Sequence, residues 1–106
     1  MTFSITCWIF DEDPQTVFDV EIHDEDKDIK FLKTEIKRVS ASRLGDVFPS
    51  DLELWQVDIP SEELREWLPE NPPLKAFQKL GIFKNGGQDH VHVIINNPGM
   101  SQSSLF

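Results

Sequence analysis

The stretch from residue 52 to residue 60, Leu-Glu-Leu-Trp-Gln-Val-Asp-Ile-Pro, constrains the fold most because it offers apolar side chains to both faces of a strand. Leu52 and Leu54 alternate with polar neighbours, and after Trp55 the apolar positions continue on the other parity. This shift predicts either cover on both faces or a β-bulge near Trp55. Strands that are apolar on both faces are usually central, and proline cannot donate to a ladder. We therefore predict an inner strand that ends at Pro60.

Two further alternating stretches, residues 2–10 and 17–23, are separated by a short polar segment that contains proline. This arrangement predicts a β-hairpin. Its inner face would carry Phe3, Ile5, Cys7, Ile9, Phe18, Val20 and Ile22. Residues 90–95 predict a last strand, with Val91, Val93 and Ile95 on one face.

An acidic segment at residues 24–28 favours the start of a helix, because carboxylates cap and stabilise a helix N-terminus. The helix predicted over 29–39 should end by Gly45 and carries an apolar stripe of Ile29, Leu32, Ile36 and Val39. Two shorter helical stretches are predicted near 61–68 and 74–81. Their apolar sides would be Leu64, Trp67 and Leu68 in the first and Leu74, Phe77 and Leu80 in the second.

The order hairpin–helix–strand–short helices–strand predicts an α+β fold, a ubiquitin-like β-grasp with a mixed sheet. The first and last strands would lie side by side and parallel at the sheet centre. A chain of 106 residues suits one domain, which we place at 1–98. Residues 99–106 would form a tail or a linker to a C-terminal domain.

A formal net charge of −9 argues against a nucleic-acid-binding protein, because the phosphate backbone repels an acidic chain. Six of the ten basic residues nevertheless cluster between 27 and 43, either as the solvated side of the helix or as a contact for nucleic acid or an acidic membrane. These are Lys27, Lys30, Lys33, Lys37, Arg38 and Arg43. The single cysteine excludes an internal disulfide. The sequence contains neither an apolar run long enough for a transmembrane segment nor a conventional signal peptide.

The ordered motifs resemble the N-terminal header domain of Crinkler effectors in its fungal form. The resemblance is carried by the strand at 18–22, by Leu-Lys-x-x-Ile-Lys at 32–37, by the strand at 52–60 and by the His-Val-His stretch leading to Pro98. Within the third motif the matching positions are Leu52, Leu54, Trp55, Ile59 and Pro60. The chain departs from oomycete members, which carry a Phe-Leu-Ala-Lys run where this sequence has Trp-Gln-Val.

The resemblance implies a secreted, non-enzymatic header domain for trafficking and protein interaction that acts in host cells, with the host nucleus as one destination. Its partners would be host proteins, its own C-terminal effector domain or a second copy in a homodimer. It implies no cofactor, no small-molecule substrate and no nucleic-acid contact through this domain. The alternative is an intracellular ubiquitin-like adaptor that binds a signalling partner.

Candidates for catalysis or metal binding are few. Cys7 is expected inside the hairpin, and no local motif combines Ser, His and Asp. An EF-hand loop beginning at Asp24 would need glycine where Ile29 stands. His90 and His92 share one face of a strand, and His23 on another strand is a third candidate zinc ligand, but solvated histidines at a strand edge are the simpler explanation. We expect no catalytic residue and no metal site.

The outer sheet face is the expected site of protein interaction, and it would be formed by Trp8, Trp55 and Val57. Exposed aromatic residues that gather on one face mark an interface for a partner or a second copy. In the alternative, residues 61–68 fold back with Trp67 and cover the two tryptophans. The sequence leaves both open.

Overall fold

The computed structural model describes residues 2–10, 12–45, 47–69, 72–83 and 89–96, so the predicted tail at 99–106 lies outside the described residues. The strands are β1 (Phe3–Ile9), β2 (Phe18–Ile22), β3 (Glu53–Pro60) and β4 (His90–Asn96). The α-helices are α1 (Ile29–Val39) and α2 (Ala41–Leu44). Short 3₁₀-helices are η1 (Pro14–Thr16), η2 (Pro49–Asp51), η3 (Ser61–Glu66) and η4 (Leu80–Phe83).

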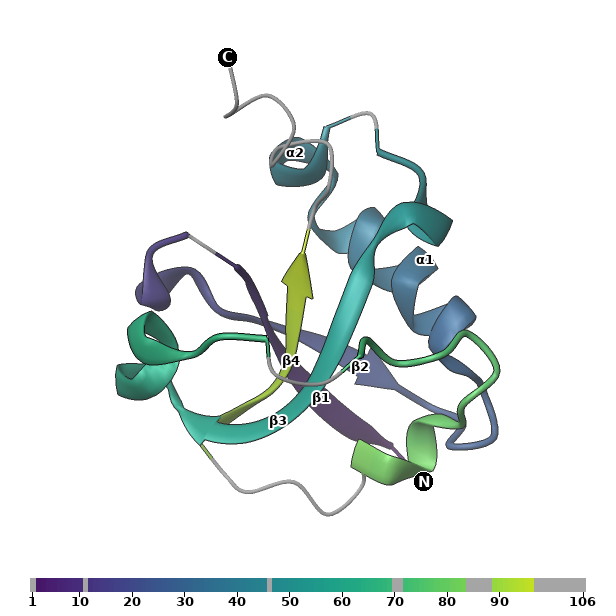
Figure 1. Ribbon diagram of the computed structural model, residues 1–106. Coiled ribbons are helices and arrows are strands. Elements are labelled where there is room, and N and C mark those ends of the chain that lie inside the picture. The colour runs from purple at the N-terminus through teal and green to yellow at the C-terminus, as the bar shows by residue number, and fades with distance from the viewer. Residues whose placement is uncertain (1, 11, 46, 70–71, 84–88, 97–106) are drawn as a thin grey trace.

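The four strands form one mixed sheet in the order β2-β1-β4-β3 (Figure 1). β1 pairs with β2 antiparallel, as the predicted hairpin requires, and with β4 in parallel, with Cys7 opposite Val93. β3 pairs with β4 antiparallel. The α+β class and the parallel pairing of the first and last strands are confirmed, and the topology is compatible with the predicted ubiquitin-like β-grasp.

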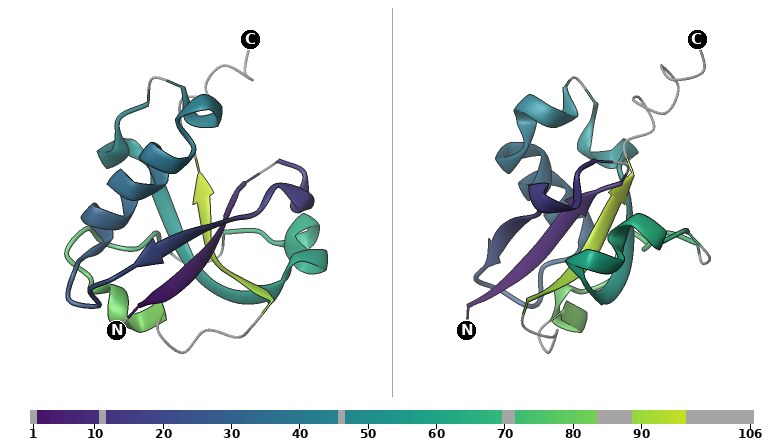
Figure 2. Two further views of the ribbon diagram at one scale, coloured as in Figure 1. Left: turned by 180° about the vertical axis from the view of Figure 1, so that it is seen from behind. Right: turned by 90° about the vertical axis from the view of Figure 1, so that its left-hand side faces the viewer.

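The prediction that β3 is an inner strand was wrong, because β3 lies at the edge of the described sheet and β4 lies inside it. The apolar outer side of β3 is partly covered by η3, which follows β3 directly in the chain, and not by a second neighbouring strand (Figure 2). The predicted bulge exists, but the register shifts between Gln56 and Ile59, beyond Trp55. The phase change of the sequence therefore marks a strand covered on both faces rather than a central strand.

β4 has buried side chains on both faces. Val93 and Ile95 belong to the core beneath α1, whereas Val91 and Ile94 belong to a second cluster on the opposite face. The prediction that Val91 shares a face with Val93 was wrong because the alternation is interrupted at His92. The His92 Nδ1 atom accepts a hydrogen bond from the backbone N–H of Thr6 at 3.2 Å.

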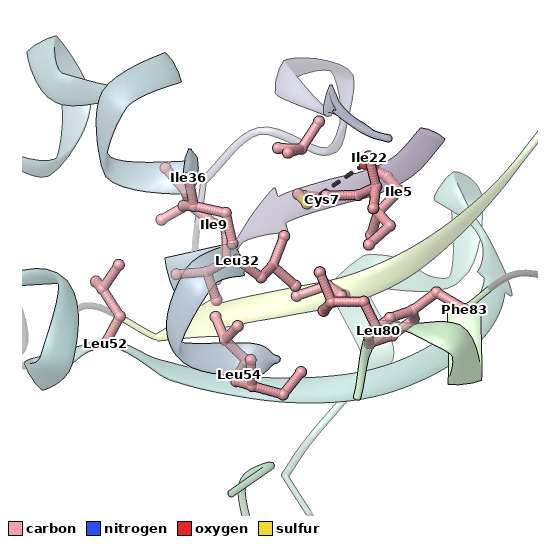
Figure 3. Packing of buried hydrophobic residues seen from close by; sticks show 14 of the residues in the cluster. Ile5, Cys7, Ile9, Ile22, Leu32, Ile36, Leu52, Leu54, Leu80 and Phe83 are labelled. Atoms are coloured by element: carbon pink, nitrogen blue, oxygen red, sulfur yellow. Dashed lines mark hydrogen bonds between the residues drawn. The ribbon is translucent and has the colours of Figure 1, made fainter. Parts of the chain in front are cut away.

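Helix α1 lies across the inner face of the sheet and closes the main core (Figure 3). Asp28 caps the helix, since its carboxylate accepts a hydrogen bond from the Phe31 N–H at 3.0 Å. This confirms the predicted cap for Asp28, whereas no acidic residue lies in the first turn of α1. The buried stripe of α1 consists of Ile29, Leu32 and Ile36.

The predicted stripe fails at its end, because Val39 is the last residue of α1 and is 45% exposed. The predicted helix over 74–81 also fails, and Phe77 is 72% exposed. The carbonyls of Ala76 and Gln78 accept hydrogen bonds from the first N–H groups of α1, at 3.1 and 2.8 Å. These carbonyls satisfy the orphan donors of α1 instead of building a helix of their own.

Replacing Ile36 by alanine should lower the free energy of unfolding by about 2–5 kcal/mol, because the deletion leaves a cavity under the helix. The matched change Val39→Ala should alter it by less than about 0.5 kcal/mol, because that side chain is largely in solvent. Urea denaturation followed by circular dichroism measures both. Equal losses for the two variants would contradict the observed end of the stripe.

Candidate protein-interaction surface

The outer face of the sheet is organised by η3, whose geometry sorts its side chains into three directions. A 3₁₀-helix has three residues per turn, so residues three apart lie above one another. Leu64 and Trp67 share the side that faces the sheet, and the Trp67 N–H donates to the Leu64 carbonyl at 3.2 Å. Leu68 would share that side in an α-helix; in the observed structure it lies beyond the end of η3 and is 68% exposed.

A second hydrophobic cluster fills the space between η3 and the sheet. Its buried members are Trp8, Leu64, Val91 and Ile94. Trp8 lies on the outer face as expected but is only 2% exposed, and its indole N–H donates to the Asp13 carbonyl at 3.2 Å. The structure therefore confirms the second alternative for Trp8: the segment after β3 folds back over the sheet and covers this side chain.

Aromatic rings continue from this cluster to the surface in edge-to-face contacts. Trp8 contacts Phe10 with ring centroids 6.0 Å apart, Phe10 contacts Trp67 at 5.6 Å, and Trp67 contacts Trp55 at 5.7 Å. Such contacts add to the stability that burial alone provides. Trp55 and Trp67 are only half-buried, so the outer end of this row remains accessible.

An open groove of about 480 Å³ lies beside these two rings, between β3 and the chain segment that leaves η3. The Leu74 N–H donates to the Leu54 carbonyl at 2.7 Å and holds the returning chain against β3. The groove is lined by Trp55, Gln56, Val57, Ile59, Glu63, Glu66, Trp67, Leu68, Pro72 and Leu74.

The predicted site residues are distributed between core and groove. Leu52 and Leu54 belong to the main core, while Trp55, Val57 and Ile59 line the groove. Pro60 ends β3 and caps η3. Seven lining residues were not among the predicted site residues, namely Gln56, Glu63, Glu66, Trp67, Leu68, Pro72 and Leu74. The three-residue spacing of Glu63 and Glu66 is the signal that would have placed them on one side of a helix.

Cys7, the one nucleophile that the sequence singled out, is buried within the main core (Figure 3). Its Sγ atom donates to the Ile5 carbonyl at 3.5 Å. Burial raises the pKa of the Cys7 thiol far above its usual range, and the negative charge of Asp19 raises it further. The thiol is therefore neutral in the folded domain.

The three histidines have separate partners. His90 Nδ1 lies 2.7 Å from Asp58 Oδ1, His23 lies 3.6 Å from a Glu21 oxygen, and His92 accepts from Thr6. Within the described ranges, no group of three potential metal ligands is brought together. Among the described helices, none combines the length and apolarity needed to cross a membrane.

The fold and this surface define a small α+β domain with a recessed aromatic face. A profile of the Crinkler effector protein N-terminal domain matches residues 3–96, from the first residue of β1 to the last residue of β4. The chain therefore belongs to the Crinkler effector N-terminal domain family. A search of curated proteins found no match to the chain.

Removal of Trp8 should cost far more stability than removal of Trp55. Trp8→Ala deletes a buried ring and should lower the free energy of unfolding by about 3–5 kcal/mol. Trp55→Ala removes a half-buried ring at the rim and should cost about 1 kcal/mol. Guanidinium denaturation followed by circular dichroism separates the two. A Trp55 loss as large as that of Trp8 would contradict the division into buried and accessible rings.

Cys7 should make the domain less stable at alkaline pH. Folding raises the pKa of the Cys7 thiol, so the thiol stabilises the folded state fully at pH values below its unfolded pKa of about 8.5. This contribution to the free energy of unfolding is lost progressively as the pH rises above that value. The chain has no tyrosine, so lysines titrating higher are the main competing side chains. Between about pH 8.5 and 10 the wild type should lose up to about 1.4 kcal/mol per pH unit more than Cys7→Ala. Urea denaturation at each pH measures the free energy of unfolding of both proteins. If the two values fall in parallel over this range, the result would contradict a buried neutral thiol.

Proposed function

We propose that this chain serves as a header domain of a secreted Crinkler-type effector: a non-enzymatic domain for trafficking and protein interaction that acts in host cells. The observation that carries the proposal is the family match, which extends over residues 3–96. Trafficking, the host cell and the host nucleus as a destination follow from what the family implies. Attachment to a C-terminal effector domain is part of the same proposal.

The described surface supports protein interaction as the mode of action. Trp55, Val57 and Trp67 line an open groove and are already fixed by packing on one side. Binding to an ordered aromatic surface loses little side-chain entropy, which makes such a surface suitable for a partner. The partner in this proposal is a host protein, the C-terminal effector domain or a second copy of this domain.

The non-enzymatic part of the proposal is supported by the state of the candidate reactive groups. The Cys7 thiol is buried and neutral, and a neutral buried thiol is a poor nucleophile. The His92 ring is committed to a backbone N–H within the sheet. These groups serve the fold.

An intracellular adaptor domain is the second candidate, because the same groove could bind a signalling partner of the producing cell. The two functions differ in where the protein is found. A delivery assay therefore separates them.

We expect the chain, fused ahead of a reporter enzyme and expressed in the producing organism, to carry the reporter out of those cells and into host cells. Reporter alone gives the background. A fusion carrying Leu32→Asp, which places a charge in the core and should unfold the domain, shows whether delivery requires the fold. Retention of the wild-type fusion in the producing cells, at the level of the reporter alone, would contradict the delivery function and favour the adaptor.

A further inference from the structure

We propose that the groove between β3 and η3 binds a peptide segment of a partner protein in which basic side chains alternate with large apolar ones. The inference rests on the proposed protein-interaction function and specifies the chemistry of the partner. It is carried by three features of the groove: its apolar floor, its acidic rim and its size.

The floor is apolar and is held in place before any partner arrives. Trp67 is fixed between Phe10 and Trp55 by edge-to-face contacts on both sides. Val57 and Ile59 line the β3 side, and Leu68 extends into solvent at the mouth. Tryptophan is enriched among residues that dominate binding energy. The floor is therefore complementary to large apolar side chains.

The rim is acidic because Glu63 and Glu66 both line the groove. Glu63 and Glu66 lie three residues apart on the same side of η3, and both are exposed. Among the described residues that line the groove, Glu63 and Glu66 are the only charged ones. Arg65 lies on another side of η3, where it lines a neighbouring hollow with Trp8 and Phe10. The basic charge of η3 is thus directed away from the groove, and the two carboxylates favour a cationic occupant.

The groove is suited to a short segment rather than to a broad surface. Its volume of about 480 Å³ is in the range of sites that hold a few side chains. It is bounded on one side by β3 and on the other by Trp67, Leu68, Pro72 and Leu74, and the backbone N–H of Leu74 is bonded to the Leu54 carbonyl of β3. An extended segment can place apolar side chains on the floor while its basic side chains reach the rim.

The charge of the chain favours a foreign partner over a second copy. Two molecules with a formal net charge of −9 repel each other, whereas a basic segment is attracted. Helix α1, whose sequence includes Lys30, Lys33 and Lys37, lies across the sheet from η3 (Figure 2). A second copy could still present them to the groove, so self-association is an outcome that the test must resolve.

The test uses the full chain and three synthetic peptides of equal length. The first alternates leucine and lysine, the second leucine and glutamate, and the third serine and lysine. Binding is measured by calorimetry and by tryptophan fluorescence, to which Trp55 and Trp67 contribute at the groove. We expect saturable binding of the leucine–lysine peptide at one site per chain, roughly tenfold weaker binding of the serine–lysine peptide, and no binding of the leucine–glutamate peptide.

A matched pair of variants locates the site. Glu63→Gln with Glu66→Gln should weaken binding of the leucine–lysine peptide by roughly fivefold and reduce its dependence on salt. Glu62→Gln with Glu21→Gln removes the same amount of charge from exposed positions outside the groove lining and should leave the affinity nearly unchanged. Leu68→Ser should also weaken binding while leaving the circular dichroism spectrum unchanged.

Equal weakening by both double variants would show a general attraction to an acidic protein and overturn the proposal. A concentration-dependent dimer that the leucine–lysine peptide dissociates would also overturn it, in favour of a second copy. Failure here is distinct from failure of the delivery function. Delivery of the reporter without peptide binding refutes only the groove, and peptide binding without delivery refutes only the role in trafficking.

Discussion

The pairing of β1 with β4 is the interaction on which the rest of the structure depends. It joins the two ends of the matched region in parallel at the centre of the sheet, with Cys7 opposite Val93 and Ile9 opposite Ile95. Both strands carry buried side chains on their two faces, so each contributes to the core under α1 and to the cluster under η3. The two hydrophobic clusters therefore share one central pair of strands.

The second cluster connects this architecture to the surface. The bulge in β3 and the turn into η3 at Pro60 bring Leu64 and Trp67 back over the sheet. This cover buries Trp8 but leaves the rim of the aromatic row accessible. The same turn that seals the core also directs two carboxylates to the groove. Core formation and the shape of the candidate site thus have one structural cause.

The sequence predicted what alternation and helical spacing determine locally. The hairpin, the capped helix α1 and the bulge follow from short-range patterns. The parallel central pair joins distant residues and was instead inferred from the β-grasp plan that the order of elements indicates. The position of β3 at the edge of the sheet could not be predicted from its sequence. A strand with apolar residues on both faces has the same sequence pattern whether its second face is covered by neighbouring elements of a central position or by a chain segment that folds back over an edge strand. The segment at 74–81 failed for a related reason: its carbonyls serve the first turn of α1, a contact between residues far apart in the chain.

The candidate site was predicted only in part. Trp55 and Val57 were identified as surface aromatic and apolar residues of the outer face, and both line the groove. Trp8 had the same pattern, and only the path of residues 61–68 decides that it is covered. The acidic rim depends on where η3 lies beside β3, because the three-residue spacing of Glu63 and Glu66 places them on one side of either an α-helix or a 3₁₀-helix. That placement is set by contacts between distant residues, which local patterns do not encode.

The central claim is that η3 folds over the outer face and holds Trp67 between a buried row of rings and an open groove. Proton–proton nuclear Overhauser effects in the folded domain test it most directly. The account predicts cross-peaks from the Trp67 indole to the rings of both Phe10 and Trp55. A Trp67 indole that shows neither cross-peak would contradict the cover, the groove and the partner chemistry inferred from them.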